Sequence, residues 1–469
     1  MNSQKAPLTP FLLAMIILST ILSIRNWPFL VEYGFSSLVY LLAAVCAFFI
    51  PISLVSAELA SGWPHQGGIY VWVKEALGKK GAFLSIWFLW ISNVVWYPLV
   101  LTFISTTILY SFAPELAKQP LYVIAVMLTV YWGVLLSNLF GIRYSGWFGT
   151  VTFLLGTLLP GLALIVFGAI WIFSGHTSHI DFSLNALIPR QVHLNEIIFL
   201  VSMVLCFAGM EMNAIHAKDV QNPSKNFPKM IFLSAFIIVV MMMLGIFSIG
   251  IALPKENVNL TTAVMDTISF YLKGFHLEGY LVVFSCIIAF GALGAMSSWI
   301  VGTSKGLLFA SEQNHLPPFL SKLNRYDVPT NLMLLQGAIV SLLIFMFVAM
   351  PSLSSAFWIL TALSSQLYLI TYVLMFVSAI LLRLKKPDVP REYTVPGGNK
   401  GLFLISGLGI ATCVFAFFIG LIPPAQLKVG SIVFYEFFLI LSIALCTLVP
   451  FLFLRRQKRA PVLLEEPKS

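Results

Sequence analysis

Residues Leu205–Met212 read LCFAGMEM and place the carboxyl group of Glu211 in the middle of an apolar segment. An ionisable side chain at membrane depth is energetically costly and therefore needs a partner or a function. Ala208 and Gly209 precede it, and glycine allows a helix to unwind and expose its backbone. The alternative interpretation is a buried glutamate that joins two helices by a hydrogen bond, where it could also carry a proton. The stretch predicts a broken helix around Glu211.

A second interrupted segment lies near the N-terminus, where Leu18–Pro28 reads LSTILSIRNWP. Arg25 and Asn26 are polar, and Pro28 lacks an amide hydrogen and disfavours helix in the residue before it. Backbone groups freed at membrane depth are tolerated only where protein or a cavity satisfies them. A simple proline kink at the outer end of a helix is the alternative. The two interruptions lie about 185 residues apart along the chain.

The composition indicates a polytopic membrane protein. Of the 469 residues, 59% are hydrophobic and 10% are charged, whereas a soluble domain carries about 25% charged residues. The apolar residues occur in long blocks, and a membrane-spanning helix needs about 20 of them. Met1–Pro10 contains one lysine, and no small-residue cleavage site follows the first apolar run. We therefore expect that run to be a retained helix rather than a signal peptide.

Twelve spanning helices are expected, because clusters of Pro and Gly separate twelve apolar blocks. The blocks are residues 8–31, 37–60, 82–112, 121–140, 147–173, 195–216, 229–253, 279–310, 332–350, 355–383, 401–422 and 431–454. Spans one to five (8–173) and six to ten (195–383) each begin with an interrupted helix. Since an odd number of spans inverts the second unit relative to the first, we predict two inverted repeats with a site between them. Residues 401–454 would add two helices and 455–469 a short basic cytoplasmic tail.

The distribution of Lys and Arg predicts that both termini are cytoplasmic. In that orientation 21 of the 27 Lys and Arg residues fall on the cytoplasmic side, five on the opposite side, and Arg25 within a span. The formal net charge of +9 then reflects this asymmetry and contact with anionic lipid, not nucleic-acid binding. We expect a multi-pass protein of a bacterial inner (cell) membrane.

The sequence carries no pattern typical of catalysis or metal binding within its spans. The five cysteines lie in apolar segments without a CxxC pair, which predicts neither a disulfide framework nor a metal site. No HExxH motif, paired aspartates or Ser-His arrangement occurs at membrane depth. We therefore expect neither an intramembrane enzyme nor a cofactor.

Four stretches of the chain, in order, carry a resemblance to a known family. They are Glu58–Ala60 with Pro64–Val73 and Ala76–Gly78, then Gly209–Glu211 with His216–Val220 and Asn222–Pro228, then Ser298–Gly306 with Leu316–Pro317 and Val328–Pro329, and finally Arg391–Gly398. By these motifs the chain resembles the amino acid–polyamine–organocation (APC) transporter superfamily, and most closely its glutamate/γ-aminobutyrate antiporter branch. The resemblance implies an all-α LeuT-like fold, with a 5+5 inverted repeat plus two C-terminal helices, that exchanges amino acids by alternating access.

The resemblance also implies a substrate site between the broken helices. Glu211 matches an acid of the sixth helix that lies at the substrate site or its gate, and Trp299 matches an eighth-helix position that lines the cavity. The first-helix break would offer free amides to the substrate's carboxylate and free carbonyls to its ammonium. The candidate substrate-binding residues are Ser19, Thr20, Ser23, Arg25, Asn93, Ala208, Gly209, Glu211, Trp299 and Tyr368. Asn93 and Tyr368 of this set, together with Trp90, Gln366 and Tyr372, are weaker candidates, for which packing is the alternative.

The chain departs from the antiporter branch at three places. The branch has a Tyr-Glu pair before the first-helix proline, where this chain has Arg25 and Asn26, and an eighth-helix acid where it has Ala295. Many members carry an extended C-terminal plug, whereas Arg455–Ser469 follow the last span here. With two acidic residues fewer and one cationic residue more, the transport pathway is more positive than in the branch. This charge favours an anionic or neutral amino-acid substrate over a dicationic one. For Arg25 the alternatives to a substrate role are a snorkelling side chain and a salt bridge to Glu32.

Amino-acid exchange without a coupling ion is the favoured hypothesis. Proton-coupled relatives have a lysine midway along the fifth span, and residues 147–173 of this chain contain no lysine. Ser297 and Ser298 are a weak indication of a sodium site. A proton- or sodium-coupled symporter is the alternative within this class, and a non-transporting amino-acid sensor is the alternative from another class. The expected partners are amino-acid substrates and membrane lipids, with a homodimer left open and no nucleic acid.

Overall fold

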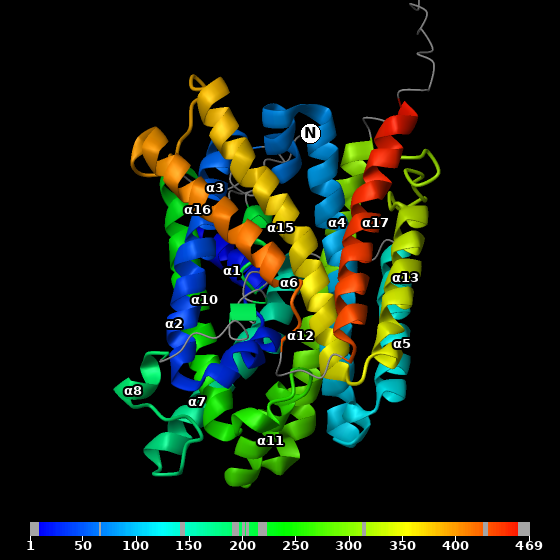
Figure 1. The fold of residues 1–469 in the computed structure, drawn as a ribbon. Coiled ribbons are helices and arrows are strands. Elements are labelled where there is room, and N and C mark those ends of the chain that lie inside the picture. The colour runs from blue at the N-terminus through cyan, green and yellow to red at the C-terminus, as the bar shows by residue number, and fades with distance from the viewer. Residues whose placement is uncertain are drawn as a thin grey trace, which may run out of the picture.

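The computed structural model describes residues 9–64, 67–140, 146–189, 197–198, 202, 206–213, 223–311, 316–424 and 430–457. These residues form a bundle of helices without strands (Figure 1). The α-helices are α1 Pro10–Ile21, α2 Ser37–Ala44, α3 Ile50–Gly62, α4 Ile69–Phe112, α5 Pro120–Leu139, α6 Gly146–Phe153, α7 Leu159–Phe173, α8 Leu184–Leu187, α10 Pro223–Ala252, α11 Ala263–Gly274, α12 Leu281–Ser311, α13 Thr330–Ile344, α14 Met346–Ala349, α15 Leu353–Lys385, α16 Gly398–Ile419 and α17 Ile432–Gln457. The 3-10 helices are η1 Ile24–Ser36, η3 Leu116–Lys118, η6 Lys255–Asn257 and η7 Glu278–Tyr280, and the π-helical segments are η2 Val45–Phe49 and η4 Leu154–Leu158.

The apolar blocks correctly predicted an all-α, multi-pass protein. Among the described residues, ten helices are long and apolar enough to cross a membrane. They correspond to predicted spans two to five and seven to twelve. Predicted span one is present as two pieces, α1 and η1, and half of predicted span six, residues 195–216, lies outside the described residues. The boundaries of the two predicted repeats, 8–173 and 195–383, stay a prediction.

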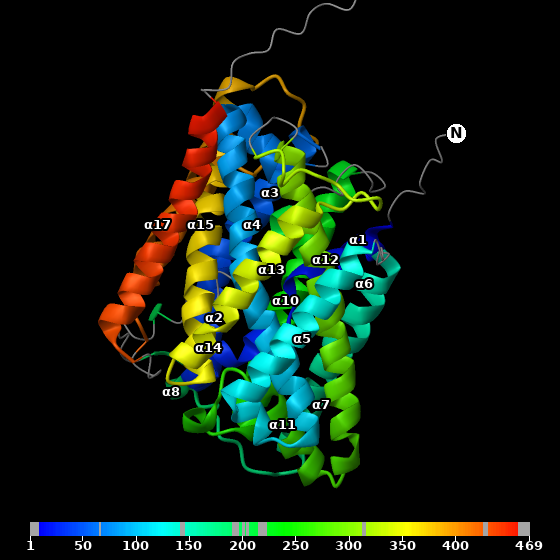
Figure 2. The same cartoon turned by 90° about the vertical axis from the view of Figure 1, so that its right-hand side faces the viewer.

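Helix α4 is the central pillar of the bundle. In its most apolar stretch of 18 residues, 89% of the residues are buried within the protein. The helix packs most extensively against α15 and α12. In the corresponding stretches of α16 and α17, only 28% and 22% of the residues are buried. Helix α17 runs along the outer edge of the molecule in Figure 2. A helix that is apolar all round faces lipid where it is not packed against protein. Side chains of α4 can therefore line an internal site, whereas α16 and α17 lie at the periphery of the bundle.

Close contact brings α6 and η4 against α12. A Cβ atom added to Gly156 would overlap the Cα atom of Gly291, and one added to Gly294 would meet the side chain of Thr152 at 2.5 Å. Small residues allow transmembrane helices to approach this closely. The consequence is a tight wall, and three of these residues, Gly156, Gly291 and Thr152, face the cavity described below.

Candidate functional site

The first helix is broken between Ile21 and Ile24. Leu22 and Ser23 are extended, with Ser23 at φ −143° and ψ 124°, and the chain resumes as η1 at Ile24. The break lies upstream of Pro28, which sits inside η1, so the proline is not the point at which the helix ends. The last carbonyls and first amides of a helix lack intrahelical partners. The carbonyl end of α1 and the amide end of η1 therefore meet at Ser23.

The sixth predicted segment is broken at Gly209, whose φ of +114° is a conformation that side chains rarely adopt. Residues 207–209 form a turn and residues 210–213 a short 3-10 segment. The Oγ1 of Thr20 lies 3.2 Å from the Oδ1 of Asn213, although 193 positions separate the two residues. A Cβ atom on Gly209 would lie 3.1 Å from the Cγ2 of Thr20. The two breaks are thus in direct contact.

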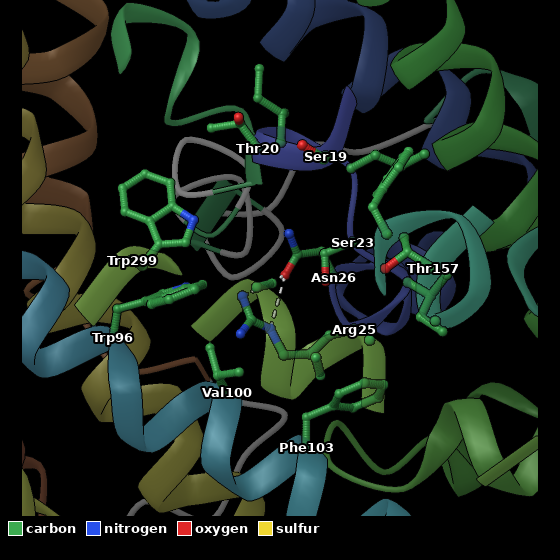
Figure 3. Close-up of a pocket in the computed structure, with 18 of the residues that line it drawn as sticks. Ser19, Thr20, Ser23, Arg25, Asn26, Trp96, Val100, Phe103, Thr157 and Trp299 are labelled. Carbon is green, nitrogen blue, oxygen red and sulfur yellow. Dashed lines mark hydrogen bonds between the residues drawn. The ribbon is translucent and has the colours of Figure 1, made fainter. Parts of the chain in front are cut away.

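A cavity of about 190 Å³ lies where the two breaks meet. Figure 3 shows side chains from several helices converging on it. Eight of the ten predicted binding residues line it: Ser19, Thr20, Ser23, Arg25, Asn93, Ala208, Trp299 and Tyr368. Asn26 and Ala295 line it as well. Arg25 is the one charged residue among the described residues of this lining, which otherwise combines apolar side chains with hydroxyl and amide groups.

Gly209 and Glu211, the other two predicted residues, are not part of the cavity lining. Glu211 is 1% exposed. The hydroxyl of Tyr368 donates to its Oε1 at 2.5 Å, and the hydroxyl of Tyr372 donates to its Oε2 at 2.8 Å. The amide of Gly209 donates to the Tyr372 hydroxyl at 3.0 Å. Glu211 therefore joins the broken segment to α15, and its connection to the cavity runs through the wall residue Tyr368.

Arg25 is the second residue of η1 and is 7% exposed. Its Nε and Nη2 each lie 3.4 Å from the Oδ1 of Asn26, and its Cζ lies 5.1 Å from the ring centroid of Trp96. The ion pairs of the described residues do not include one between Arg25 and Glu32. The side chain is therefore buried against the cavity, which favours neither of the two alternatives, a snorkelling side chain and a salt bridge to Glu32.

Sequence reasoning missed Trp96, which lines the cavity from α4. Trp96 follows Asn93 by three positions, so the two side chains project from the same face of the helix. Its ring centroid lies 5.9 Å from that of Trp299. The helical spacing from Asn93 is the signal that would have identified it. Thr152 and Thr157 also line the cavity, and no motif marks them.

Of the weaker candidates, Asn93 and Tyr368 line the cavity, whereas Trp90, Gln366 and Tyr372 lie outside its lining. The indole nitrogen of Trp90 donates to the Oε1 of Gln336 at 3.1 Å, and the amide of Gln366 donates to a main-chain carbonyl of α16 at 3.2 Å. Ser297 is hydrogen-bonded to Asn138 of α5, at 3.2 Å. Because its hydroxyl is directed to α5 and not to the break, the indicated sodium site gains no support from Ser297.

Two motif segments meet at the end of α3. Glu58 is 3% exposed and accepts hydrogen bonds from Arg383 at 2.9 and 2.5 Å and from the amide of Val395 at 2.7 Å. The Nε of Arg391 lies 3.6 Å from the same carboxylate. Burial lowers the pKa of Arg391, and the neighbouring Glu58 opposes this effect. Glu58 therefore anchors the connection between α15 and α16, residues 386–397, to the end of α3.

The broken helices, the shared cavity and the anchored connection agree with one family. The sequence profile of the amino acid permease family matches residues 8–444. The chain belongs to this family. The permease is therefore a membrane transporter and not an enzyme, and its resemblance to the APC superfamily, with a LeuT-like fold, is confirmed.

The permease is similar over most or all of its length to several curated transporters. An uncharacterized transporter of Legionella pneumophila is 38% identical over 456 residues, which cover 97% of this chain and 98% of that protein. A glutamate/γ-aminobutyrate antiporter of Lactococcus lactis is 29% identical over 476 residues, or 100% of this chain and 94% of the antiporter. A probable agmatine/putrescine antiporter of the same species is 21% identical over 393 residues, or 83% and 82%.

Proposed function

We propose that this permease is an amino-acid antiporter that exchanges acidic or neutral amino acids by alternating access. The observation that carries the proposal is the cavity at the junction of α1, η1 and the turn at Gly209. The amide end of η1 would bind the α-carboxylate of the substrate, and the carbonyl end of α1 would bind its ammonium group. Such half-helix ends at a repeat interface are the way many transporters hold zwitterions.

Exchange, rather than ion-coupled uptake, is supported by two observations. Transporters similar to this chain include a glutamate/γ-aminobutyrate antiporter and a probable agmatine/putrescine antiporter. Within the chain, residues 147–173 contain no lysine, and Ser297 is engaged by Asn138. The permease would then move one amino acid inward for each amino acid moved outward.

The proposed location is a bacterial inner membrane with cytoplasmic N- and C-termini. The C-terminal ends of α15 and α17 and the start of α4 lie at one end of the bundle, and α11 lies at the other (Figure 1). Basic residues are concentrated at the first end: Lys74, Lys79, Lys80, Arg383, Lys385 and Lys386. Positive charge of this kind is typical of the cytoplasmic side.

Counterflow in proteoliposomes tests the proposal. Vesicles containing the purified permease are preloaded with one unlabelled amino acid at a time, and uptake of labelled glutamate, glutamine, γ-aminobutyrate and alanine is measured. We expect at least one preloaded acidic or neutral amino acid to accelerate uptake severalfold over empty vesicles, without an ion gradient. Protein-free liposomes and arginine-loaded vesicles are the controls.

Three results would overturn the antiporter proposal. If no preloaded amino acid accelerates uptake under any gradient, the permease does not exchange these substrates. Uptake into empty vesicles that depends on a sodium or proton gradient would identify a symporter. Saturable binding of an amino acid without any flux would identify a sensor.

A further inference from the structure

Arg25 is a buried cation without a carboxylate partner in the described part of the chain. Its described polar contacts are the two to Asn26 Oδ1, at 3.4 Å each, and both use the same acceptor oxygen. A guanidinium group offers five N–H donors. Burial of a charge without a paired, hydrogen-bonded counter-charge is costly. The remaining donors of Arg25 are therefore available to an anion that enters the cavity.

The surroundings hold the Arg25 guanidinium in one orientation. Trp96 lies beside it, with 5.1 Å between the Cζ and the ring centroid, a distance typical of a cation–π contact. Figure 3 shows the side chain extending from η1 between Asn26 and Val100 toward Trp96. Trp96 in turn packs against Trp299, with ring centroids 5.9 Å apart. A planar donor fork held in this way is suited to a carboxylate, which it can bind through two parallel hydrogen bonds.

The position of Arg25 separates it from the groups that would bind the substrate backbone. Arg25 is the second residue of η1, whereas the break is centred on Leu22 and Ser23. An amino acid held by the break therefore has its α-carboxylate and ammonium satisfied by main-chain groups. A second carboxylate, on the side chain, would extend from the break into the space beside Arg25.

We propose that Arg25 binds the side-chain carboxylate of the substrate and that the permease consequently selects dicarboxylic amino acids over their neutral amides. This inference rests on the proposed function, since it takes an amino acid at the break as its starting point. Trp96 and Asn26 act as positioning residues that orient the guanidinium.

Binding measurements on the purified full-length permease test the inference without requiring transport. The dissociation constants of L-glutamate and L-glutamine, which have nearly the same shape but differ in side-chain charge, are measured by titration for wild type, Arg25→Gln and Arg25→Lys. We expect wild type to prefer glutamate. In Arg25→Gln, glutamate binding should weaken about 10- to 100-fold, the range for a charge-assisted hydrogen bond, and glutamine binding should change less than about threefold. Arg25→Lys should be intermediate, because an ammonium group cannot form the bidentate pair.

Arg325→Gln is the matched control. Arg325 also lies over an aromatic ring, with its Cζ 4.7 Å from the centroid of Tyr326, but it is exposed and does not line the cavity. The control should bind both ligands as wild type does. If Arg25→Gln does not fold, as judged by gel filtration and thermal unfolding, Arg25→Lys retains the buried charge and carries the same comparison.

Several outcomes would overturn the inference. If a folded Arg25 variant loses affinity for glutamate and glutamine equally, Arg25 binds the α-carboxylate of the substrate and not its side chain. Unchanged binding of both ligands would make Arg25 a structural residue, and a wild type that binds glutamine more tightly than glutamate, or binds neither, would contradict the selectivity. A wild type that binds glutamate through Arg25 but shows no counterflow would support the subsite and contradict the proposed antiport.

Discussion

Tyr368 donates a 2.5 Å hydrogen bond to Glu211, so that a wall residue of the cavity is bound directly to the acid behind it. The Tyr372 hydroxyl donates a hydrogen bond to the second carboxylate oxygen at 2.8 Å and accepts one from the amide of Gly209. The broken segment and α15 are thus connected by one buried carboxylate. Any movement of this segment during transport must either carry α15 along or break these bonds.

Replacement of Glu211 by glutamine should slow exchange about tenfold or more. An amide has one acceptor oxygen in place of two, so one tyrosine hydroxyl loses its partner, and an unsatisfied buried polar group costs about 1–3 kcal/mol. Initial rates of counterflow and their pH dependence measure the effect. Exchange with unchanged rate and pH profile would leave Glu211 with a structural role alone.

Tyr368→Phe should impair the same process while leaving the chain folded. The variant removes the hydroxyl that contacts Glu211 Oε1, and the ring remains to fill the wall. Tyr435→Phe is the control, since its hydroxyl is also buried and hydrogen-bonded, to Trp358 and the carbonyl of Gly420, but lies outside the cavity lining. Equal effects of the two substitutions on exchange would argue against a special role of the Tyr368–Glu211 bond.

Gly209→Ala should weaken substrate binding and destabilise the permease. The φ of +114° is unfavourable for alanine, and the new Cβ would lie 3.1 Å from Thr20 Cγ2; strained backbone of this kind costs about 1–3 kcal/mol. The measurements are the thermal midpoint in detergent and the rate of counterflow. Gly133→Ala, at an exposed helical position with open space around it, should be neutral or slightly stabilising. A Gly209→Ala variant as stable and active as Gly133→Ala would contradict the strained break.

Arg383→Gln should destabilise the permease by about 3–5 kcal/mol, because it leaves the carboxylate of Glu58 buried without its main partner. The two side chains are 10% and 4% exposed. A double-mutant cycle with Glu58→Gln, read by thermal unfolding, should show that the paired substitution costs less than the sum of the single ones. Lys118→Gln, which removes an exposed ion pair with Glu115, should change stability by less than about 1 kcal/mol. If the stability effects of the two single substitutions simply add in the double variant, Glu58 and Arg383 are not energetically coupled.

Alkaline stability should depend on Tyr393. Burial, together with the nearby Glu58, raises the pKa of Tyr393 to about 12, above the value near 10 of an unfolded tyrosine. The folded state therefore retains the proton more tightly, and its contribution to stability is complete below pH about 10 and is lost as the pH rises toward about 12. Thermal midpoints measured from pH 8 to 11 should fall more steeply in wild type than in Tyr393→Phe. Parallel curves for the two proteins would contradict this prediction, and Tyr280→Phe serves as the exposed control.

Several features of the permease followed from the sequence because they are local. The free energy of placing a helix in lipid depends on its own side chains, so twelve apolar blocks predicted an all-α multi-pass protein. Gly209 and the polar residues near Arg25 are costly in such a helix, and they predicted two breaks. Motifs in four stretches were sufficient to identify the superfamily. The first break lies at Leu22 and Ser23, within the stretch Ser19–Pro28 in which it was predicted, and η1 accommodates Pro28.

The tertiary structure alone decided which polar side chains share a cavity and which are held behind its wall. The resemblance implied that Glu211 lies at the substrate site or its gate, yet Glu211 is outside the cavity lining and is hydrogen-bonded to the wall residue Tyr368. Trp96 was overlooked and lies against Arg25, and Glu58 pairs with Arg383 across 325 positions. These contacts depend on how separate helices pack, and hydropathy and helical period describe each helix by itself. The sequence thus determined where helices form and break, and packing between distant helices determined what each polar group faces.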